Sequence, residues 1–535
     1  MAKKSFFKGA VILGIAGVIV KIFGAFFRIP LANIIGDTGM GYYQTAYPVY
    51  VLLLTLSTAG IPTAIARLVS ERKTEENHRE AYRIFKLSFG LLLGLGIVTS
   101  LLLFLGAPYI VRAMEGEPEA VYSMRAIAPA LLFVPMMAAF RGYFQGLQDM
   151  TPTAVSQVVE QLFRVACGLS LALFLLPYGL KYAAAGASSG AAIGGVFGLM
   201  GILAIFLVKK KSIKKECEEA KEGPSESAKI ILEKIVIIAV PVTIGAAIMP
   251  IMTNIDLAIV VRRLVDAGYT SAEANSLYGQ LSGFATPLIN LPQVMTQAIA
   301  MSLVPAIAAA HRSRDDGFLR YNTSFGIRTA MLIGMPCAVG LMVLSEPIML
   351  LLYPAQKASA VSAAGCLFIL AFGTIFLSLV QTLTGILQGI GKQLIPVASL
   401  AVGAVVKVII TYILTGIPSI NVKGAAVGTA AAYLTASVFN LIAVRRYTGC
   451  RPDISLTYVK PAFSAAVMGV VVWVIHHLTS GLVGNAVSTM ISVLCGVLVY
   501  AVLILVLKGI TPEEIRMLPK GEKISKILNF NSRKD

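Results

Sequence analysis

The chain has 535 residues, of which 57% are hydrophobic and only 13% charged, and its mean hydropathy is +0.80. This composition excludes an ordinary water-soluble protein, because a soluble chain of this length could not keep so apolar a surface in water. The formal net charge of +18 could indicate nucleic-acid binding, but the cations flank apolar segments, which favours a membrane protein without a nucleic-acid partner.

Long apolar stretches recur along the whole chain. About 20 apolar residues cross the ~30 Å hydrocarbon core of a bilayer, and many stretches exceed that length. We therefore predict an all-α integral membrane protein with about 14 transmembrane helices. Their expected ranges are 8–30, 43–70, 83–107, 120–147, 152–177, 182–208, 229–262, 275–310, 318–345, 358–389, 393–417, 422–446, 457–480 and 484–508.

The loops between these helices alternate in basic content. Basic runs occur at residues 3–8, 72–86, 209–215, 312–320 and 445–451, whereas the intervening loops carry few cations. Lys and Arg in short loops are retained on the cytoplasmic side of a membrane. The pattern therefore predicts a multi-pass protein with both termini in the cytoplasm.

Two halves of the chain share a sequence pattern. The Gly142–Gly146 run resembles Gly385–Gly389, and the same spacing carries Arg164 onto Lys407. Equal orientation of the halves predicts a parallel repeat about an axis normal to the membrane. The predicted division is a six-helix lobe 1–208, a cytoplasmic linker 209–228, a second six-helix lobe 229–446, two further helices 447–508 and a basic cytoplasmic tail 509–535.

Charged and amide side chains recur at helical spacing inside several predicted spans. A charge at membrane depth costs roughly 2.5–3.5 kcal/mol on insertion scales, so such residues commonly mark a path for a polar ligand. Arg and Lys in related places of both lobes predict a shared cavity for an anion. The candidate lining residues are Lys21, Arg28, Gln157, Gln161, Arg164, Asn290, Gln293 and Lys407.

Two acidic residues accompany these cations. Glu160 lies four residues before Arg164, at the spacing of an ion pair on one helix, and Asp256 lies in the span 229–262. Each could form a structural ion pair or bind a coupling cation. The ridge of Gly186, Gly190, Gly194 and Gly198 is interpreted as a packing surface only.

Several segments resemble a known family. The opening KIFGAFFRIPLANIIGDTGMGYYQTAYPVY, the following STAGIPTAIARLVSE and the run GYFQGLQ before Thr151-Pro152 are similar to the stage V sporulation protein B and polysaccharide biosynthesis branch of the multidrug/oligosaccharidyl-lipid/polysaccharide (MOP) exporter superfamily. That branch is related to the MurJ lipid II flippases. Arg28 matches the arginine-bearing first helix of those proteins, and Asn33 stands where a second arginine is expected.

The resemblance implies a flippase of the bacterial plasma membrane. Its substrate would be an anionic lipid-linked glycan, such as the undecaprenyl-pyrophosphate-linked peptidoglycan precursor lipid II, moved from the inner to the outer leaflet. That activity would serve cell-wall and polysaccharide biosynthesis or sporulation. Membrane lipids and a coupling cation are further expected partners, the chain is expected to act as a monomer, and no cofactor or metal is expected.

Other functions remain open from the residues alone. A cation-coupled drug or metabolite antiporter of the same fold would use Glu160 and Asp256 for the coupling cation. A non-transporting membrane protein of cell-wall or spore assembly would not need buried charges. A membrane glycosyltransferase is disfavoured, since no outer loop carries a carboxylate cluster suited to catalysis.

Overall fold

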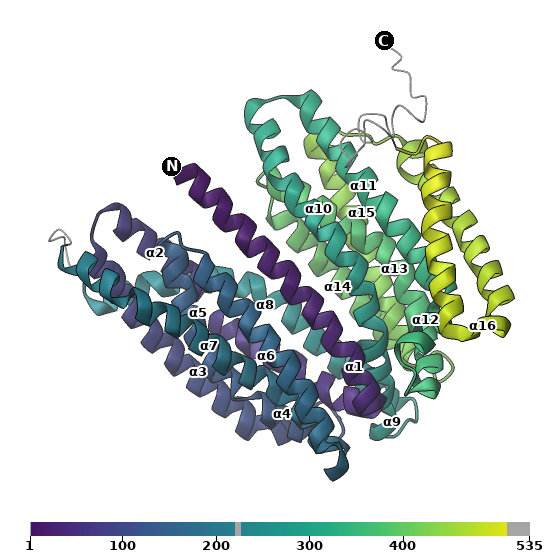
Figure 1. Cartoon of the computed structure of the whole chain (residues 1–535), viewed down its shortest axis with the longest axis horizontal. Coiled ribbons are helices and arrows are strands. Elements are labelled where there is room, and N and C mark those ends of the chain that lie inside the picture. The colour runs from purple at the N-terminus through teal and green to yellow at the C-terminus, as the bar shows by residue number, and fades with distance from the viewer. Residues whose placement is uncertain (1, 220–225, 511–535) are drawn as a thin grey trace. The chain divides into compact units, whose positions relative to one another are not determined.

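The computed structural model describes residues 2–219 and 226–510, and every regular element in that part of the chain is a helix (Figure 1). The prediction of an all-α protein is therefore confirmed. In the first helix, the side chains of residues 2–11, 15, 18, 21 and 25 lie outside the described part. The predicted basic tail lies outside it from residue 511 onward.

The helices follow one another with short connections. Their bounds are α1 (Ala2–Thr58), α2 (Ile61–Thr74), α3 (His78–Ala113), α4 (Ala120–Ile127), α5 (Ala130–Gly146), α6 (Thr151–Leu175), η1 (Leu176–Tyr178), α7 (Leu180–Glu218), α8 (Ala228–Asp266), α9 (Ser271–Gly279), η2 (Gln280–Ala285), α10 (Thr286–Ser313), α11 (Asp316–Val343), α12 (Ser345–Leu352), α13 (Lys357–Gly389), α14 (Leu394–Thr415), α15 (Lys423–Thr448), η3 (Ser455–Val459) and α16 (Lys460–Val506).

Within the described residues, 12 helical segments are long and apolar enough to cross a membrane. The two longest, Ile22–Thr74 with 53 residues and Ser455–Val506 with 52, are more than two and a half times as long as the about 20 residues that one crossing needs at ~1.5 Å per residue. Gly36 (φ 65°) and Gly484 (φ 77°) interrupt these two segments in the left-handed region that glycine adopts readily. Two crossings in each agree with the fourteen predicted spans.

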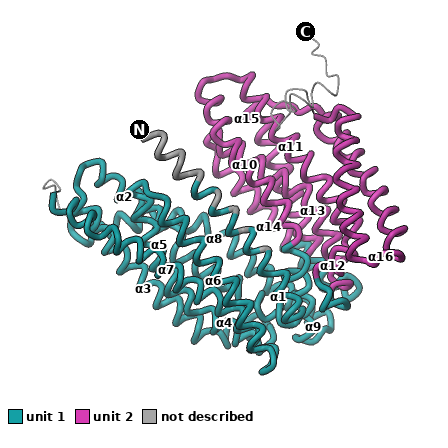
Figure 2. The backbone as a smooth tube through the Cα atoms, viewed as in Figure 1, with its two compact units in different colours: residues 1–287, 353–359, 408–425 teal, residues 288–352, 360–407, 426–535 magenta. Residues whose placement is uncertain are grey.

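The chain packs as two compact units (Figure 2). Unit 1 comprises residues 1–287, 353–359 and 408–425, and unit 2 comprises residues 288–352, 360–407 and 426–535. Helices α8 and α9 pack on α1 within unit 1. These units are defined by contacts, whereas the lobes predicted above are defined by the sequence repeat, so the lobe boundaries stay a prediction.

An aromatic cluster holds α3, α5 and α7 together in unit 1. The ring centroid of Phe85 lies 4.8 Å from that of Tyr143, 5.0 Å from that of Phe140 and 5.5 Å from that of Phe206. Such aromatic pairs contribute about 0.5–1.5 kcal/mol each beyond the burial of their area. This packing fixes the end of α5 that carries Arg141.

The glycines of the two matching motifs lie at close helix contacts, each within its own unit. A Cβ atom at Gly142 of α5 would lie 2.8 Å from the Pro62 carbonyl oxygen of α2. A Cβ atom at Gly385 of α13 would lie 2.7 Å from the Ala300 carbonyl oxygen of α10. Only glycine allows backbones to approach so closely, so the two copies of the motif make the same kind of helix contact.

Close helix contacts also lie one turn before Arg164 and one turn before Lys407, the two cations that the predicted repeat places at the same position. A Cβ atom at Gly194 would lie 2.5 Å from the Glu160 carbonyl oxygen, and one at Gly403 would lie 2.6 Å from the Ala432 carbonyl oxygen. Glu160 and Gly403 precede the two cations by one helical turn. The helix pairs α6–α7 and α14–α15 therefore approach at corresponding positions, although the glycine stands on opposite members of the pair.

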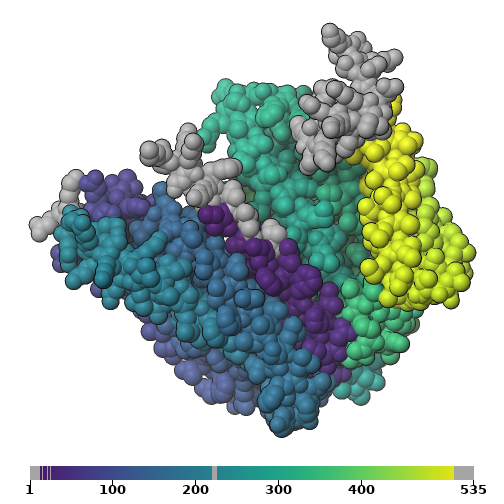
Figure 3. All heavy atoms as spheres, in the orientation of Figure 1, coloured from purple at the N-terminus to yellow at the C-terminus, as the bar shows by residue number. Residues whose placement is uncertain are grey.

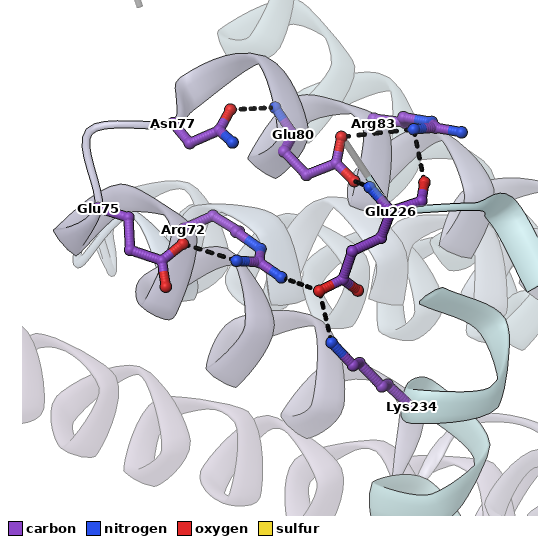
Figure 4. Close-up of polar contacts among 7 residues, drawn as sticks. All are labelled: Arg72, Glu75, Asn77, Glu80, Arg83, Glu226 and Lys234. Carbon is purple, nitrogen blue, oxygen red and sulfur yellow. Dashed lines mark hydrogen bonds and ion pairs between the residues drawn. The ribbon is translucent and has the colours of Figure 1, made fainter. Parts of the chain in front are cut away.

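The polar residues around the predicted linker join α2, α3 and α8. Helix α7 continues through the basic run to Glu218, and the described chain resumes at Glu226. The Glu226 carboxylate accepts from Arg72 and, at 2.5 Å, from Lys234 Nζ, while its backbone N–H donates to Glu80 Oε1 at 3.1 Å (Figure 4). These contacts hold the start of α8 against the α2–α3 connection.

In unit 2, α16 supplies the two predicted C-terminal helices. It packs on α11 and α12, and its side chains form an outer surface of that unit, drawn in yellow in Figure 3. The Tyr500 hydroxyl donates to the Leu332 carbonyl oxygen at 2.9 Å, and Asn485 Nδ2 donates to the Pro347 carbonyl oxygen at 3.1 Å. These bonds satisfy polar groups that lipid could not.

Candidate anion-binding site in unit 1

A carboxylate bridges two arginines where α5 meets α6. Glu160 Oε2 lies 3.0 Å from Arg141 Nη2, and Glu160 Oε1 lies 3.3 Å from Arg164 Nη2. The three side chains are only 13–15% exposed. Arg141 Nε also donates to the Ser156 hydroxyl at 2.9 Å. Because two cations share one anion, this triad keeps a net positive charge.

The glycine ridge of α7 presses directly on the triad. A Cβ atom at Gly190 would lie 2.7 Å from the Arg164 carbonyl oxygen, and one at Gly198 would lie 2.9 Å from Glu160 Cβ. The ridge is thus a packing surface, as expected. Its consequence for the site is that the Glu160–Arg164 turn of α6 is held by backbone contact, which limits its freedom to move.

Three tyrosines of α1 lie beside Arg164. Tyr43, Tyr47 and Tyr50 follow the i, i+4, i+7 spacing of one helical face, and all three lie near the Arg164 guanidinium. The rings of Tyr43 and Tyr47 stack with centroids 5.6 Å apart. Arg164 Nε is buried and has no hydrogen-bond partner among the described residues, so the guanidinium retains a donor for another acceptor.

Arg28 reaches the same tyrosines from the first half of α1. Its guanidinium carbon lies 5.9 Å from the centroid of the Tyr47 ring, in cation–π geometry. Tyr43 lies near both Arg28 and Arg164. The two arginines predicted to share a ligand cavity therefore act on common neighbours within unit 1. Lys21 lies on the same helix, but its side chain is outside the described part.

The predicted polar face of α6 meets α1. Gln161 is 7% exposed, and a Cβ atom at Gly24 would lie 3.8 Å from its Nε2 atom. Gln157, one turn earlier, is half-buried. These two amides therefore belong to the side of α6 that also carries Glu160 and Arg164.

Asp256 lies in α8 of unit 1. It is half-buried and lies near Tyr278 of α9, as Arg28 does. Its neighbour Asn254 is buried and donates to the Pro48 carbonyl oxygen at 2.9 Å, which ties α8 to α1. The use of Asp256 for a coupling cation stays a proposal.

The remaining predicted lining residues belong to unit 2. Lys407 lies on α14, and Asn290 and Gln293 lie near the start of α10; all three are half-buried. Close to them along α10, the buried Thr296 hydroxyl donates to Gln381 Oε1 of α13 at 2.5 Å. The assignment of these residues to the substrate path stays a prediction.

Sequence reasoning missed Arg141 and the tyrosine face. Arg141 lies inside the predicted span 120–147, so the criterion that selected Arg164, a charge within an apolar span, also selects it. The tyrosines carry no such signal, since aromatic residues are common in membrane helices near the interfaces. Together these groups offer arginine donors and aromatic faces, which suit a phosphate-bearing ligand.

The comparisons with known proteins agree with this architecture. The family model described as polysaccharide biosynthesis protein matches residues 6–311, and the MatE model matches residues 282–413. Stage V sporulation protein B of Bacillus subtilis (strain 168) is 28% identical over 526 residues, covering 97% of this chain and 98% of that protein. Lipid II flippase MurJ of the same organism is 28% identical over 483 residues, covering 88% of each chain.

A solved structure shares the fold. The inward closed conformation of lipid II flippase MurJ superposes with a TM-score of 0.70 at 16% identity, covering 93% of this chain and 98% of that one. The family model spans more than half of the chain, and the resemblance inferred from the sequence is confirmed. The chain belongs to the polysaccharide biosynthesis protein family of the MOP exporter superfamily.

Proposed function

We propose that the chain is a flippase that moves an undecaprenyl-pyrophosphate-linked glycan from the inner to the outer leaflet, with lipid II as its substrate. The observation that carries this proposal is the Arg141–Glu160–Arg164 triad, in which Glu160 compensates only one of the two positive charges. Similarity to lipid II flippase MurJ over 88% of the chain supports the class of cargo.

The triad suits a pyrophosphate for a physical reason. A guanidinium binds phosphate oxygens through paired N–H donors, and such charge-assisted bonds contribute about 1.5–3 kcal/mol each. Glu160 engages one Arg164 nitrogen and leaves Arg164 Nε available. Arg28 over the Tyr47 ring supplies a second guanidinium next to the same tyrosines.

Transport would follow alternating access, the mechanism expected of two repeated bundles around one path. Moving an anion outward across an inside-negative membrane potential is favourable by about 2.3 kcal/mol per charge per 100 mV. We propose that this potential, or a cation bound at Asp256, drives the cycle. The proposal includes cytoplasmic termini and a monomeric unit of transport.

The experiment depletes the protein in a bacterial strain that lacks every other flippase of this cargo. Precursor accessible on the outer leaflet should fall, and precursor should accumulate inside. Arg164→Gln should lower outer-leaflet precursor as depletion does, although the variant protein is present at its normal level. Arg67→Gln is the control and should behave as wild type, because the Arg67 side chain is 66% exposed and pairs with Glu71. Normal outer-leaflet precursor after depletion would reject the proposal.

The position of Asp256 motivates a second candidate function, a cation-coupled antiporter. Asp256 and Arg28 share Tyr278 as a neighbour, so a carboxylate lies within the same polar region as a site cation. Efflux of a cationic dye that requires this chain and disappears in Asp256→Asn would favour the antiporter. Absence of any dye efflux, together with loss of precursor translocation, would favour the flippase.

A further inference from the structure

A groove runs between α14 and α15 in unit 2. Its volume is about 320 Å³, and the residues that line it include Ile395, Ser399 and Val402 of α14 with Phe439, Ile442 and Arg446 of α15. The residues of each helix recur at steps of three and four, so the groove is formed by one face of each helix. It uses none of the residues of the site in unit 1.

The walls of the groove are apolar and reachable from outside. Val402 is 43% exposed, Phe439 48% and Ile442 58%. The Ser399 hydroxyl in the wall donates to the Ile395 carbonyl oxygen of its own helix at 2.9 Å. Both helices meet the criteria of membrane spans, so the groove suits a hydrocarbon chain rather than water.

One end of the groove is cationic. Arg446 lies in the last turn of α15 and lines the groove, as does the Tyr447 ring next to it. Lys392, just before α14, places its Nζ atom 5.2 Å from the centroid of that ring. The segments 394–415 and 423–448 contain no Asp or Glu, so neither helix supplies a counter-charge of its own.

We propose that this groove binds an anionic phospholipid of the cytoplasmic leaflet. An acyl chain would lie along Val402, Phe439 and Ile442, and the phosphate would contact Arg446 and Lys392. Basic pockets between membrane helices on the cytoplasmic side recognise anionic head groups in this way. The leaflet follows from the basic run 445–451, which the positive-inside rule assigns to the cytoplasm.

The test measures binding of dioleoylphosphatidylglycerol to the purified, delipidated full-length protein by native mass spectrometry, with dioleoylphosphatidylcholine as the neutral probe. Arg446→Gln should weaken phosphatidylglycerol binding about fivefold, and Arg445→Gln, the adjacent exposed cation outside the lining, should not. Val402→Trp should block the groove, whereas Val405→Trp, 59% exposed on the same helix, should not.

Melting temperatures of all four variants confirm that each remains folded. Loss of phosphatidylglycerol binding in Arg446→Gln and Val402→Trp, but not in their two controls, supports the proposal. Equal effects of Arg445→Gln and Arg446→Gln would indicate diffuse attraction of the lipid to a basic surface and would overturn the proposal. Equal effects of Val402→Trp and Val405→Trp, or equal binding of the anionic and the neutral lipid, would overturn it as well. The result is independent of flippase activity, because no residue of the unit 1 site is changed.

Discussion

Arg141 of α5 and Glu160 of α6 form an ion pair of 3.0 Å that joins the two helices in unit 1. Glu160 also pairs with Arg164 one turn further along α6, at 3.3 Å. The carboxylate therefore has a structural task, to hold two like charges together. Arg164 can also bind a further acceptor, because its Nε atom has no hydrogen-bond partner among the described residues.

This division of tasks predicts different effects of neutralising each residue. Glu160→Gln leaves Arg141 and Arg164 as unpaired like charges, so it should destabilise the protein by about 3 kcal/mol, the lower end of the cost of breaking a buried pair. Arg164→Gln leaves the Arg141–Glu160 pair intact and should destabilise the protein less than Glu160→Gln does. Thermal unfolding of the purified variants measures both. A larger loss of stability in Arg164→Gln than in Glu160→Gln would contradict this account.

The close approach of α7 to α6 predicts a steric effect at one glycine. Gly194→Ala would place a Cβ atom 2.5 Å from the Glu160 carbonyl oxygen, so the helices must move apart. A cost of about 1–3 kcal/mol is expected for such overpacking. Gly201→Ala is the matched control, because its Cβ atom would meet Val159 at an ordinary 3.9 Å. Equal melting temperatures of the two variants would show that the α6–α7 contact is loose.

Tyr47 is predicted to act through its ring rather than its hydroxyl. Tyr47→Ala removes the aromatic face under Arg28 and should weaken binding of undecaprenyl pyrophosphate roughly fivefold, the equivalent of about 1 kcal/mol. Tyr47→Phe keeps the ring and should bind nearly as wild type. Titration of the purified variants with that lipid measures the difference. Equal losses in both variants would instead assign the role to the hydroxyl.

The contacts of Glu226 predict a pH dependence of stability. The hydrogen bond from Lys234 and the charge of Arg72 lower the pKa of the Glu226 carboxyl below its ordinary value. A carboxyl with a lowered folded-state pKa stabilises the protein above its unfolded-state pKa, and this stabilisation is lost as pH falls through the folded-state value. The clamp drawn in Figure 4 should therefore weaken on acidification.

Melting temperatures from about pH 4 to about pH 8 test this linkage. Glu226→Gln should have a lower melting temperature than wild type at neutral pH, and its melting temperature should fall less on acidification. Glu219→Gln is the control, since Glu219 is 66% exposed and its pair with Lys215 spans 3.6 Å. Parallel pH profiles of wild type and Glu226→Gln would show that the clamp contributes nothing.

The helical fold could be predicted because it depends on local properties. Apolar length identifies each span, and the similar Gly142 and Gly385 motifs predict the repeat; in the structure both glycines lie where helix backbones approach closely. The long uninterrupted helix through residues 209–218 was less evident. Its composition is typical of a surface linker, yet α7 continues through it to Glu218.

The site could be predicted only in part. Glu160 and Arg164 are one turn apart on one helix, so their pairing follows from spacing. The pairing of Glu160 with Arg141 depends on how α5 and α6 pack. The contact of Arg28 with Tyr47 depends on how α1 bends at Gly36. Local patterns carry no direct signal for such contacts, which is why Arg141 and the tyrosines were missed.

The central claim is that Arg164 binds the pyrophosphate of a lipid carrier. The most direct test compares the affinities of purified wild type and Arg164→Gln for undecaprenyl pyrophosphate and for undecaprenol, which has the same chain and no phosphate. The account predicts that Arg164→Gln weakens pyrophosphate binding at least about tenfold and leaves undecaprenol binding unchanged. Equal pyrophosphate affinity of wild type and a folded Arg164→Gln variant would contradict it.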